Sequence, residues 1–159
     1  MNILHVVNIY FVLPFFIGDQ FKYFKERGYH MNVVCSPSDY LPNYAKEQGF
    51  QFIESPVNRS ISIKEDILTI RNICKFIKRK KIDIIIGHTP KGGLLAMISG
   101  WICRVPKRIY FRHGLVYETS HGVKRFILIS VDRLASFCFI QVVCVSQSVL
   151  RRSIEDKLA

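Results

Sequence analysis

Short, almost uninterrupted apolar runs alternate with longer amphipathic segments along the chain. The apolar runs are typical of strands buried on both faces of a parallel sheet, and residues 82–87 are the clearest of them. The segments between them repeat apolar residues at helical spacing and end near glycine or proline. Strands are predicted at residues 3–9, 31–35, 50–54, 82–87, 108–111 and 140–145. Helices are predicted at residues 19–27, 41–48, 62–81, 94–102, 122–139 and 147–158.

The regular alternation of strand and helix predicts the fold class. It indicates an α/β domain, with a doubly wound, Rossmann-like parallel sheet and helices on both faces. The 159 residues suit one compact domain, and no repeat, linker or low-complexity stretch divides them. With 49% hydrophobic and 22% charged residues, the chain can bury a core, and disorder is not expected.

The helix predicted at residues 62–81 has the clearest pattern. Its apolar stripe is expected to face the core and consists of Ile63, Ile67, Ile70, Cys74 and Ile77. Ser62 and Glu65 have the spacing of a capping box, in which each side chain bonds a backbone N–H of the first turn. The opposite face is basic and consists of Lys64, Arg71, Lys75 and Lys78, followed by Arg79, Lys80 and Lys81. Positive charge at a helix C-terminus complements the helix dipole, which is a sufficient structural explanation for the final cluster.

The formal net charge of +11 bears on possible partners. Such a surface attracts nucleic acid, anionic lipid or phosphorylated substrates, and a basic surface that is merely solvated is equally common. No helix-turn-helix pattern or RNA-binding aromatic signature is present, so nucleic acid is not expected as a partner. A non-catalytic basic binding module, for an anionic membrane surface or for nucleic acid, stays open as the alternative to an enzyme domain.

Five cysteines, an odd number with no CxxC pair, favour neither a disulfide framework nor a zinc site. Most of them fall within apolar runs, and a reducing, cytoplasmic compartment is expected. The apolar N-terminus lacks a basic segment and a cleavage site, so it is interpreted as a strand and loop and not as a signal peptide. The apolar run at residues 137–145 is too short to span a bilayer.

The residues that follow the predicted strands are the candidate functional residues, because ligands of open parallel sheets bind beyond the carboxyl ends of the strands. Asn8 and Tyr10 follow the first strand, in a loop that runs to Gly18. Ser146 follows the last strand. All four residues are predicted to contribute to substrate binding.

The segment HTPKGG, residues 88–93, follows the fourth strand and enters a helix. Glycines allow close backbone approach, and N–H groups at a helix start favour an anion, to which Thr89 and Lys91 can add donors. Equally, Gly92 and Gly93 can serve only to pack the helix tightly on the sheet. Neither a P-loop nor a GxGxxG fingerprint occurs, and no HExxH or similar spacing indicates a metal, so no cofactor is expected.

Arg112, His113 and Gly114 follow the fifth strand. A histidine there can donate to or accept from a sugar hydroxyl or phosphate oxygen at neutral pH, and Gly114 permits a turn that exposes it. A satisfied structural histidine is the alternative. Glu118 can bind an acceptor hydroxyl or act as a base, although a carboxylate in a loop more often caps or solvates it. Of the other histidines, His5 and His30 are interpreted as structural, and His88 and His121 as intermediate.

Two segments of the chain resemble family 4 glycosyltransferases, especially bacterial enzymes that build capsular or exopolysaccharide repeat units. Residues 82–118, IDIIIGHTPKGGLLAMISGWICRVPKRIYFRHGLVYE, carry a helix start similar to the family's HTPKAG and then HG after the next strand. Residues 142–152, VVCVSQSVLRR, carry the V-S-x-S strand end. The three motifs occur in order at matching spacing, and the resemblance covers nearly the whole chain.

The resemblance implies a GT-B enzyme, in which two Rossmann-like domains face each other across a cleft. Residues 1–159 would then be the N-terminal, acceptor-side domain, and a C-terminal domain outside them would bind most of the nucleotide-sugar donor. Family members retain the anomeric configuration and generally need no metal. The resemblance implies that His113 is catalytic and projects into the cleft near the transferred sugar. Gly92 and Gly93 would shape the helix start beside it, and the loop after residue 9 would line the cleft near the donor phosphates.

Two features depart from the family pattern. The loop after the first strand reads YFVLPFFIGDQ and holds only Gly18, where many members have a Gly-Gly pair, so phosphate contact by this loop is less expected. The donor-binding domain is absent from residues 1–159, so the chain is expected to be one part of a longer or split enzyme and to be inactive alone.

The predicted function is part of the transfer of a sugar from a nucleotide-sugar to a saccharide acceptor linked to a polyprenyl diphosphate. Because such acceptors lie in the membrane, the basic surface is predicted to hold the protein on the inner face of the cytoplasmic membrane. The candidate contacts are the basic face of the long helix together with Lys124 and Arg125. Phe15 and Phe16 are candidates for shallow insertion if they are exposed.

Overall fold

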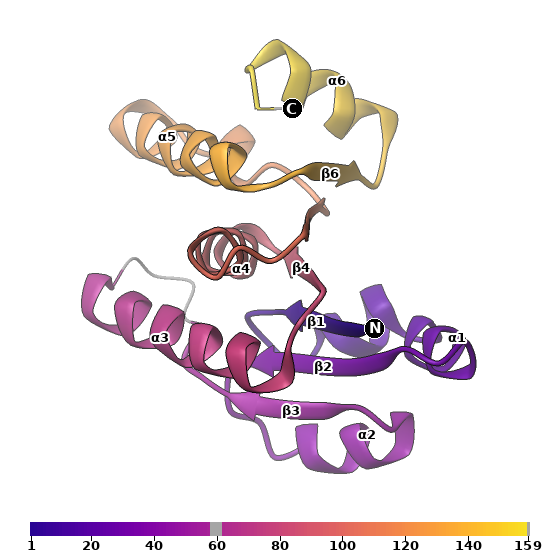
Figure 1. Ribbon diagram of the computed structural model, residues 1–159. Coiled ribbons are helices and arrows are strands. Elements are labelled where there is room, and N and C mark those ends of the chain that lie inside the picture. Colours follow the sequence, from indigo (N-terminus) through magenta and orange to yellow (C-terminus); the bar gives the residue numbers. More distant parts are fainter. Residues whose placement is uncertain (58–61, 159) are drawn as a thin grey trace.

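The computed structural model describes residues 1–57 and 62–158 and confirms the predicted α/β fold class. Six parallel strands in these residues form one sheet in the order β3-β2-β1-β4-β5-β6 (Figure 1). The strands are β1 (Asn2–Val6), β2 (His30–Cys35), β3 (Gln51–Glu54), β4 (Ile84–His88), β5 (Lys107–Arg112) and β6 (Gln141–Cys144). The α-helices are α1 (Gln20–Glu26), α2 (Leu41–Gln48), α3 (Ile63–Lys80), α4 (Pro90–Ile102), α5 (Gly122–Cys138) and α6 (Gln147–Glu155).

Two short helical segments are missing from the sequence prediction. One is a π-helical turn, η1 (Leu13–Ile17), in the loop after β1, and the other is a 3-10 turn, η2 (Val116–Thr119), after β5. α4 also begins at Pro90, four residues before the predicted start. Pro90 suits the first turn of a helix, because its missing N–H would have no partner inside the helix there. Within the described residues, no helix is long and apolar enough to cross a membrane.

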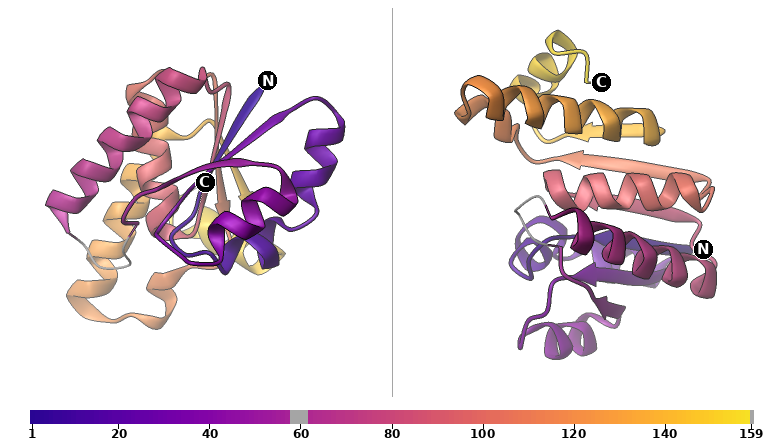
Figure 2. Two further views of the ribbon diagram at one scale, coloured as in Figure 1. Left: turned by 90° about the horizontal axis from the view of Figure 1, so that it is seen from below. Right: turned by 90° about the vertical axis from the view of Figure 1, so that its left-hand side faces the viewer.

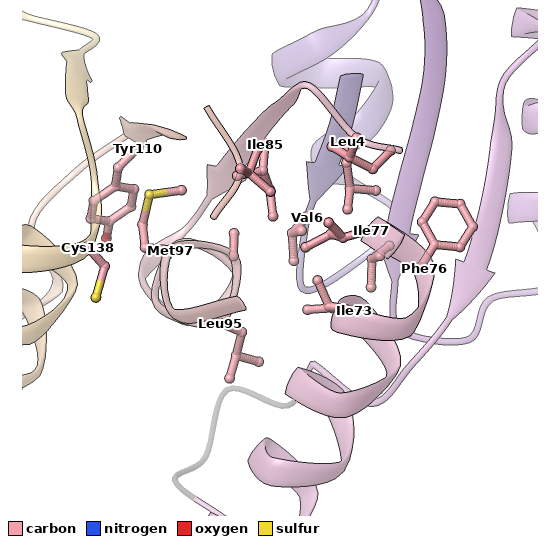
Figure 3. Close-up of a cluster of buried hydrophobic side chains, with 14 of the residues drawn as sticks. Leu4, Val6, Ile73, Phe76, Ile77, Ile85, Leu95, Met97, Tyr110 and Cys138 are labelled. Carbon is pink, nitrogen blue, oxygen red and sulfur yellow. The ribbon is translucent and has the colours of Figure 1, made fainter. Parts of the chain in front are cut away.

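Helices cover both faces of the sheet. α3, α4 and α5 lie side by side on one face, and α1 and α2 lie on the other (Figure 1; Figure 2). Because side chains alternate along a strand, β1 sends Leu4 and Val6 into the core beneath α3 and α4 (Figure 3). Ile3 of the same strand and Val7, which follows it, enter a second core on the side of α1 and α2. The central strand β1 therefore contributes to two apolar layers.

The buried stripe of α3 differs from the predicted one. Ile63 and Ile67 are exposed, and the buried residues are Thr69, Ile73, Phe76 and Ile77. An 18-residue helix is about 27 Å long, whereas a five-residue strand such as β4 spans about 16 Å, so one end of the helix has no sheet to cover. Thr69 is tolerated in the core because its hydroxyl donates to Pro56 O at 2.9 Å.

The capping box predicted at the start of α3 is only partly right. Ser62 is the N-cap residue, but its side chain makes no capping hydrogen bond. Its backbone oxygen accepts the N–H of Asp66 at 2.8 Å, and Glu65 and Asp66 place negative charge in the first turn. The helix start is therefore stabilised by its acidic first turn, where negative charge suits the helix dipole, and not by a serine cap.

Candidate functional site

A cleft of about 640 Å³ opens where β1, β4 and β5 end. Its walls come from the loop after β1, the start of α4, the segment from the end of β5 to η2, and Leu128 of α5. The predicted site residues that line it are Asn8, Thr89, Lys91, Arg112, His113 and Gly114. A smaller pocket of about 120 Å³ shares Lys91 and Gly114 with the cleft and is also lined by Asp66 and Asp132. The carboxyl edge of the sheet thus brings together residues from four separate parts of the sequence.

Four buried polar atoms of cleft-lining residues have no hydrogen-bond partner among the described residues. They are Oδ1 of Asn8, which is an acceptor, Nδ1 of His113, and Nε and Nη1 of Arg112. Buried polar atoms in folded proteins are nearly always bonded. The atoms of Asn8 and His113 are therefore candidates for bonds to a bound ligand.

His113 is the outer member of a chain of three histidines. Nδ1 of His5 lies 3.0 Å from Nε2 of His88, and Nδ1 of His88 lies 3.1 Å from Nε2 of His113. The strand register explains why they meet. His5 pairs with Ile86, two residues before His88, and His88 pairs with Phe111, two residues before His113. Since side chains two residues apart point to the same face of a sheet, all three imidazoles lie on the α1 side.

Burial keeps these three imidazoles neutral. Loss of hydration lowers the pKa of His5 to about 3. Burial also lowers the pKa of His88 well below its usual value, and charge on His5 or His113 would lower it further. The pKa of the half-buried His113 is lowered by burial as well. The aromatic ring of Phe16, in η1, covers His113 with the ring centres 4.3 Å apart.

The start of α4 largely satisfies its own backbone. Pro90 has no N–H, and Thr89 accepts the N–H of Gly92 on its side-chain oxygen at 3.3 Å and the N–H of Gly93 on its backbone oxygen at 2.8 Å. Thr89 has φ +64° and ψ 157°, a conformation that is strained for any residue except glycine. Because the N–H groups of Gly92 and Gly93 are already bonded, the helix start has few free N–H groups for a ligand. What it presents instead is the strained backbone of Thr89 and the side chain of Lys91.

Gly92 and Gly93 lie on the face of α4 that packs against the sheet and do not line the cleft. A Cβ on Gly92 would lie 2.8 Å from Val6 O, and a Cβ on Gly93 would lie 2.2 Å from the Tyr110 ring. Both glycines therefore let α4 pack directly on β1 and β5, which is the packing explanation that the sequence left open. Lys91 lines the cleft and is ion-paired with Asp66 of α3, so its ammonium group is held in place beside the opening.

Arg112 lines the cleft with a side chain that is fully buried. Its Nη2 donates to Asp132 Oδ1 at 3.3 Å and to Ser136 Oγ at 3.4 Å, which ties β5 to α5. Burial raises the pKa of Asp132, and the Arg112 charge partly opposes that rise. Nε and Nη1 of Arg112 have no partner among the described residues. The residue is thus a link between sheet and helix.

The remaining predicted site residues lie away from this cleft lining. Tyr10 stacks on Tyr40 with ring centres 5.7 Å apart. Gly18 ends η1 with φ +46°, and Glu118 is exposed in η2. Ser146 is the N-cap of α6 and accepts the N–H of Val149 at 3.3 Å. His88 is buried directly beneath His113 and reaches the cleft only through it.

Sequence reasoning overlooked His5, which it interpreted as structural only. The signal that could have found it is a histidine in an otherwise apolar strand. A second such histidine, His88, occurs in the strand that a Rossmann-like order places next to the first. Phe16 and Asp66 were overlooked as neighbours of His113 and Lys91. The three histidines form a chain and do not converge, and in the described ranges no group of three potential ligands is placed to hold a metal ion. All five cysteines are free.

Comparison with known proteins gives a family match and three similar curated proteins, among them one from Staphylococcus aureus and one from Escherichia coli. The family described as "Glycosyl transferase 4-like" matches residues 3–144. The capsular polysaccharide biosynthesis glycosyltransferase CapM of Staphylococcus aureus is 28% identical over 158 residues, which are 99% of this chain and 40% of that protein. The UDP-Gal:alpha-D-GlcNAc-diphosphoundecaprenol alpha-1,3-galactosyltransferase of Escherichia coli is 24% identical over 127 residues, 79% of this chain and 33% of that protein.

Among solved structures, Anabaena HepE in complex with UDP and glucose is similar in fold. It superposes with a TM-score of 0.72 at 15% identity, and the match covers 98% of this chain and 41% of that one. At this identity the likeness shows the fold alone. The chain spans about 40% of the length of CapM and about a third of that of the galactosyltransferase.

Proposed function

The chain belongs to the glycosyl transferase 4-like family, and we propose that it is the N-terminal, acceptor-side domain of a retaining glycosyltransferase that builds a capsular or exopolysaccharide. The non-catalytic binding module is not favoured by this family membership. The chain spans 40% of the length of CapM, so the proposal assigns most of the donor site to a second domain. The whole enzyme would transfer a sugar from a nucleotide-sugar to a lipid-linked saccharide.

The convergence of Asn8, Thr89, Lys91 and His113 on one cleft is the observation that carries the proposal. A saccharide needs donors and acceptors at several hydroxyl groups, and the cleft offers the unpartnered Oδ1 of Asn8 and Nδ1 of His113. A diphosphate needs positive charge, and the ammonium group of Lys91 supplies it at the cleft wall. The Escherichia coli relative is named for a diphosphoundecaprenol-linked acceptor, which has both parts.

Within this proposal the residues have separate roles. His113 contacts the transferred sugar or an acceptor oxygen, Lys91 faces the acceptor diphosphate, and Asn8 accepts from a sugar hydroxyl. The Lys91–Asp66 pair keeps the ammonium group in position, which lowers the entropy lost when the acceptor binds. The apolar walls, which include Phe16 and Val116, exclude water from the site and strengthen these polar contacts.

Calorimetry on the chain tests the division between acceptor and donor. A water-soluble, short-chain polyprenyl-diphosphate saccharide should bind, and His113→Ala and Lys91→Ala should each weaken binding at least several-fold. Common uridine and guanosine diphosphate sugars should show no tight binding, because their site is assigned to the second domain. Micromolar affinity of the chain for a nucleotide-sugar, with no affinity for the acceptor, would reverse the assignment.

We also propose that the protein lies on the inner face of the cytoplasmic membrane. The beginning of α5 supports this, because Val123 and Phe126 are 75% and 70% exposed and flank Lys124 and Arg125 in the sequence. An apolar ridge flanked by basic residues is typical of helices that lie in a membrane interface. Phe11, at the cleft, stacks on exposed Phe15 with ring centres 4.1 Å apart and adds a second apolar contact beside the same opening.

The basic end of α3 is a less suitable membrane contact than the beginning of α5. Lys78–Lys81 lead directly into the start of β4, so they lie at the amino edge of the sheet, opposite the cleft. A membrane at that edge would hold a lipid-linked acceptor away from His113. The two helices therefore give opposite orientations, and only the α5 orientation brings the acceptor to the cleft.

Sedimentation with anionic vesicles distinguishes the two surfaces. Lys124→Glu with Arg125→Glu should weaken binding roughly thirty-fold, since each basic residue near such a surface contributes about 1 kcal/mol. Lys78→Glu with Arg79→Glu, a matched double reversal, should change binding much less. Equal losses from both pairs would indicate a diffuse charge effect, and no binding of the wild-type chain at low salt would remove the membrane proposal.

A further inference from the structure

We propose that His5 and His88 are positioning residues that hold His113 in its Nδ1–H tautomer, so that His113 meets a ligand as a hydrogen-bond donor and not as a base. The tautomer is inferred from the geometry of the three rings. Its consequence for sugar transfer rests on the proposed function of the cleft.

The number of ring protons leaves only two tautomeric arrangements for the three histidines. Three neutral imidazoles share three ring protons, and two of these must lie in the His5–His88 and His88–His113 hydrogen bonds. If the remaining proton lies on Nδ1 of His113, every ring carries its proton on Nδ1. If it lies on Nε2 of His5, every ring carries its proton on Nε2. The two hydrogen bonds therefore couple the tautomer of the deeply buried His5 to the tautomer of His113 at the cleft.

The two ends of the chain favour the Nδ1–H arrangement. His5 is 1% exposed, its Nε2 has no partner, and its ring packs edge-on against Phe21. A proton on that nitrogen would create a buried N–H donor that no water or ligand can reach. Orphaned buried donors are rarer in proteins than under-satisfied acceptors. At the other end, Nδ1 of His113 is also buried and unpartnered, but His113 lines the cleft, where a ligand oxygen can accept a hydrogen bond from Nδ1–H.

This arrangement limits what His113 can do. Its Nε2 lone pair accepts the N–H of His88, and its Nδ1 already carries a proton, so no lone pair remains to take a proton from a hydroxyl group. Freeing the Nδ1 lone pair would mean carrying the ring proton on Nε2 instead, which would require His88 and His5 to change tautomer together and would leave the orphaned N–H on His5. His113 can therefore stabilise negative charge on an oxygen. It cannot serve as a general base unless all three histidines change tautomer.

Nitrogen NMR on the unliganded chain, with ¹⁵N-labelled histidine, measures the tautomers directly. The proposal expects His5, His88 and His113 all as Nδ1–H at neutral pH. It also expects a ¹⁵N–¹⁵N coupling across each of the two hydrogen bonds. Finding His113 as Nε2–H, or finding no coupling between His88 and His113, would overturn it.

Variants separate positioning from a merely structural role. His88→Phe preserves a ring in the stack but removes the donor, so His113 should lose its single tautomer while thermal unfolding remains cooperative. His88→Gln, whose amide can donate, should restore the Nδ1–H form of His113. His121→Phe replaces an exposed histidine that is not one of the three, so it should change neither the tautomer of His113 nor the cooperativity of thermal unfolding. If His88→Phe fails to fold, the wild-type tautomers still decide the question.

Binding of the short-chain acceptor keeps the two proposals distinguishable. His88→Phe should weaken that binding about three- to ten-fold, as expected for one hydrogen bond whose donor is no longer fixed. If the wild-type chain binds no acceptor but shows three Nδ1–H histidines, the proposed function fails and the tautomer inference stands. If it binds the acceptor with His113 as Nε2–H, the function stands and this inference fails.

Discussion

The buried histidine chain should make the stability of the protein fall steeply between pH 6.5 and pH 5. His5 has its folded-state pKa lowered from 6.5 to about 3, so the unfolded chain binds a proton in this range and the folded chain does not. As pH falls, the folding equilibrium shifts towards the state that binds more protons, and here that state is the unfolded one. The contribution of His5 is therefore complete above pH 6.5 and is lost as pH drops towards 3.

The magnitude follows from the linkage relation. One group that titrates only in the unfolded state changes the free energy of unfolding by about 1.4 kcal/mol per pH unit, so His5 accounts for roughly 2 kcal/mol between pH 6.5 and pH 5. The pKa of His88 is lowered in the same direction, so its protonation in the unfolded chain adds to this fall. The contribution of His5 alone is already a sizeable share of the 5–15 kcal/mol typical of a folded domain.

Urea unfolding followed by circular dichroism at pH 8, 6.5 and 5 measures this effect. The free energy of unfolding should be nearly constant from pH 8 to about pH 7 and should then fall. Asp132 has the opposite sign, because its pKa is raised by burial, so its protonation stabilises the folded chain as pH falls. His121→Gln should retain the wild-type pH dependence, whereas His5→Leu should reduce it. A free energy of unfolding that stays constant or rises on acidification to pH 5 would refute the reasoning.

Three further predictions concern single positions. Gly93→Ala should destabilise the domain by about 1–3 kcal/mol, because the new methyl group overlaps the Tyr110 ring, whereas Gly114→Ala, with nothing within 4 Å, should change urea stability little. Thr89→Gly should be at least as stable as the wild type, because glycine relieves the strain at φ +64°. Thr89→Val retains the strain and loses the side-chain cap, so it should be about 1 kcal/mol less stable than the wild type. Arg112→Ala should cost about 3–5 kcal/mol by leaving Asp132 without its partner, and Arg112→Met combined with Asp132→Leu should recover most of that loss in a double-mutant cycle.

The fold class and the edge of the sheet that holds the cleft could be predicted from sequence because both depend on simple rules. Alternating strands and helices define a doubly wound sheet, and such sheets place ligand sites at their carboxyl edge. This is why Asn8, Thr89 and His113, which are far apart in the sequence, were expected at one edge. The buried face of α3 was predicted less well, because the stripe of isoleucines gives no information on where the helix passes the end of the sheet.

The histidine chain could not be predicted because it depends on strand register. A shift of one residue between β1 and β4 would turn His5 to the opposite face from His88. The cover that Phe16 forms over His113 depends on a π-helical turn, whose hydrogen bond from Gly18 N–H to Leu13 O has no sequence signature. Sequence therefore identified the outer residue of the site, and only the packed structure identified the residues behind it.

The central claim is that the cleft at the carboxyl edge receives the acceptor. Paramagnetic relaxation in NMR tests it most directly, with a nitroxide attached to the saccharide of a short-chain polyprenyl-diphosphate acceptor. Broadening should concentrate on Asn8, Thr89 and His113 and should spare Glu47 and Gln51, which lie on α2 and β3 away from the cleft lining. Broadening centred on α2 and β3, or none at an acceptor concentration that saturates binding, would contradict the account.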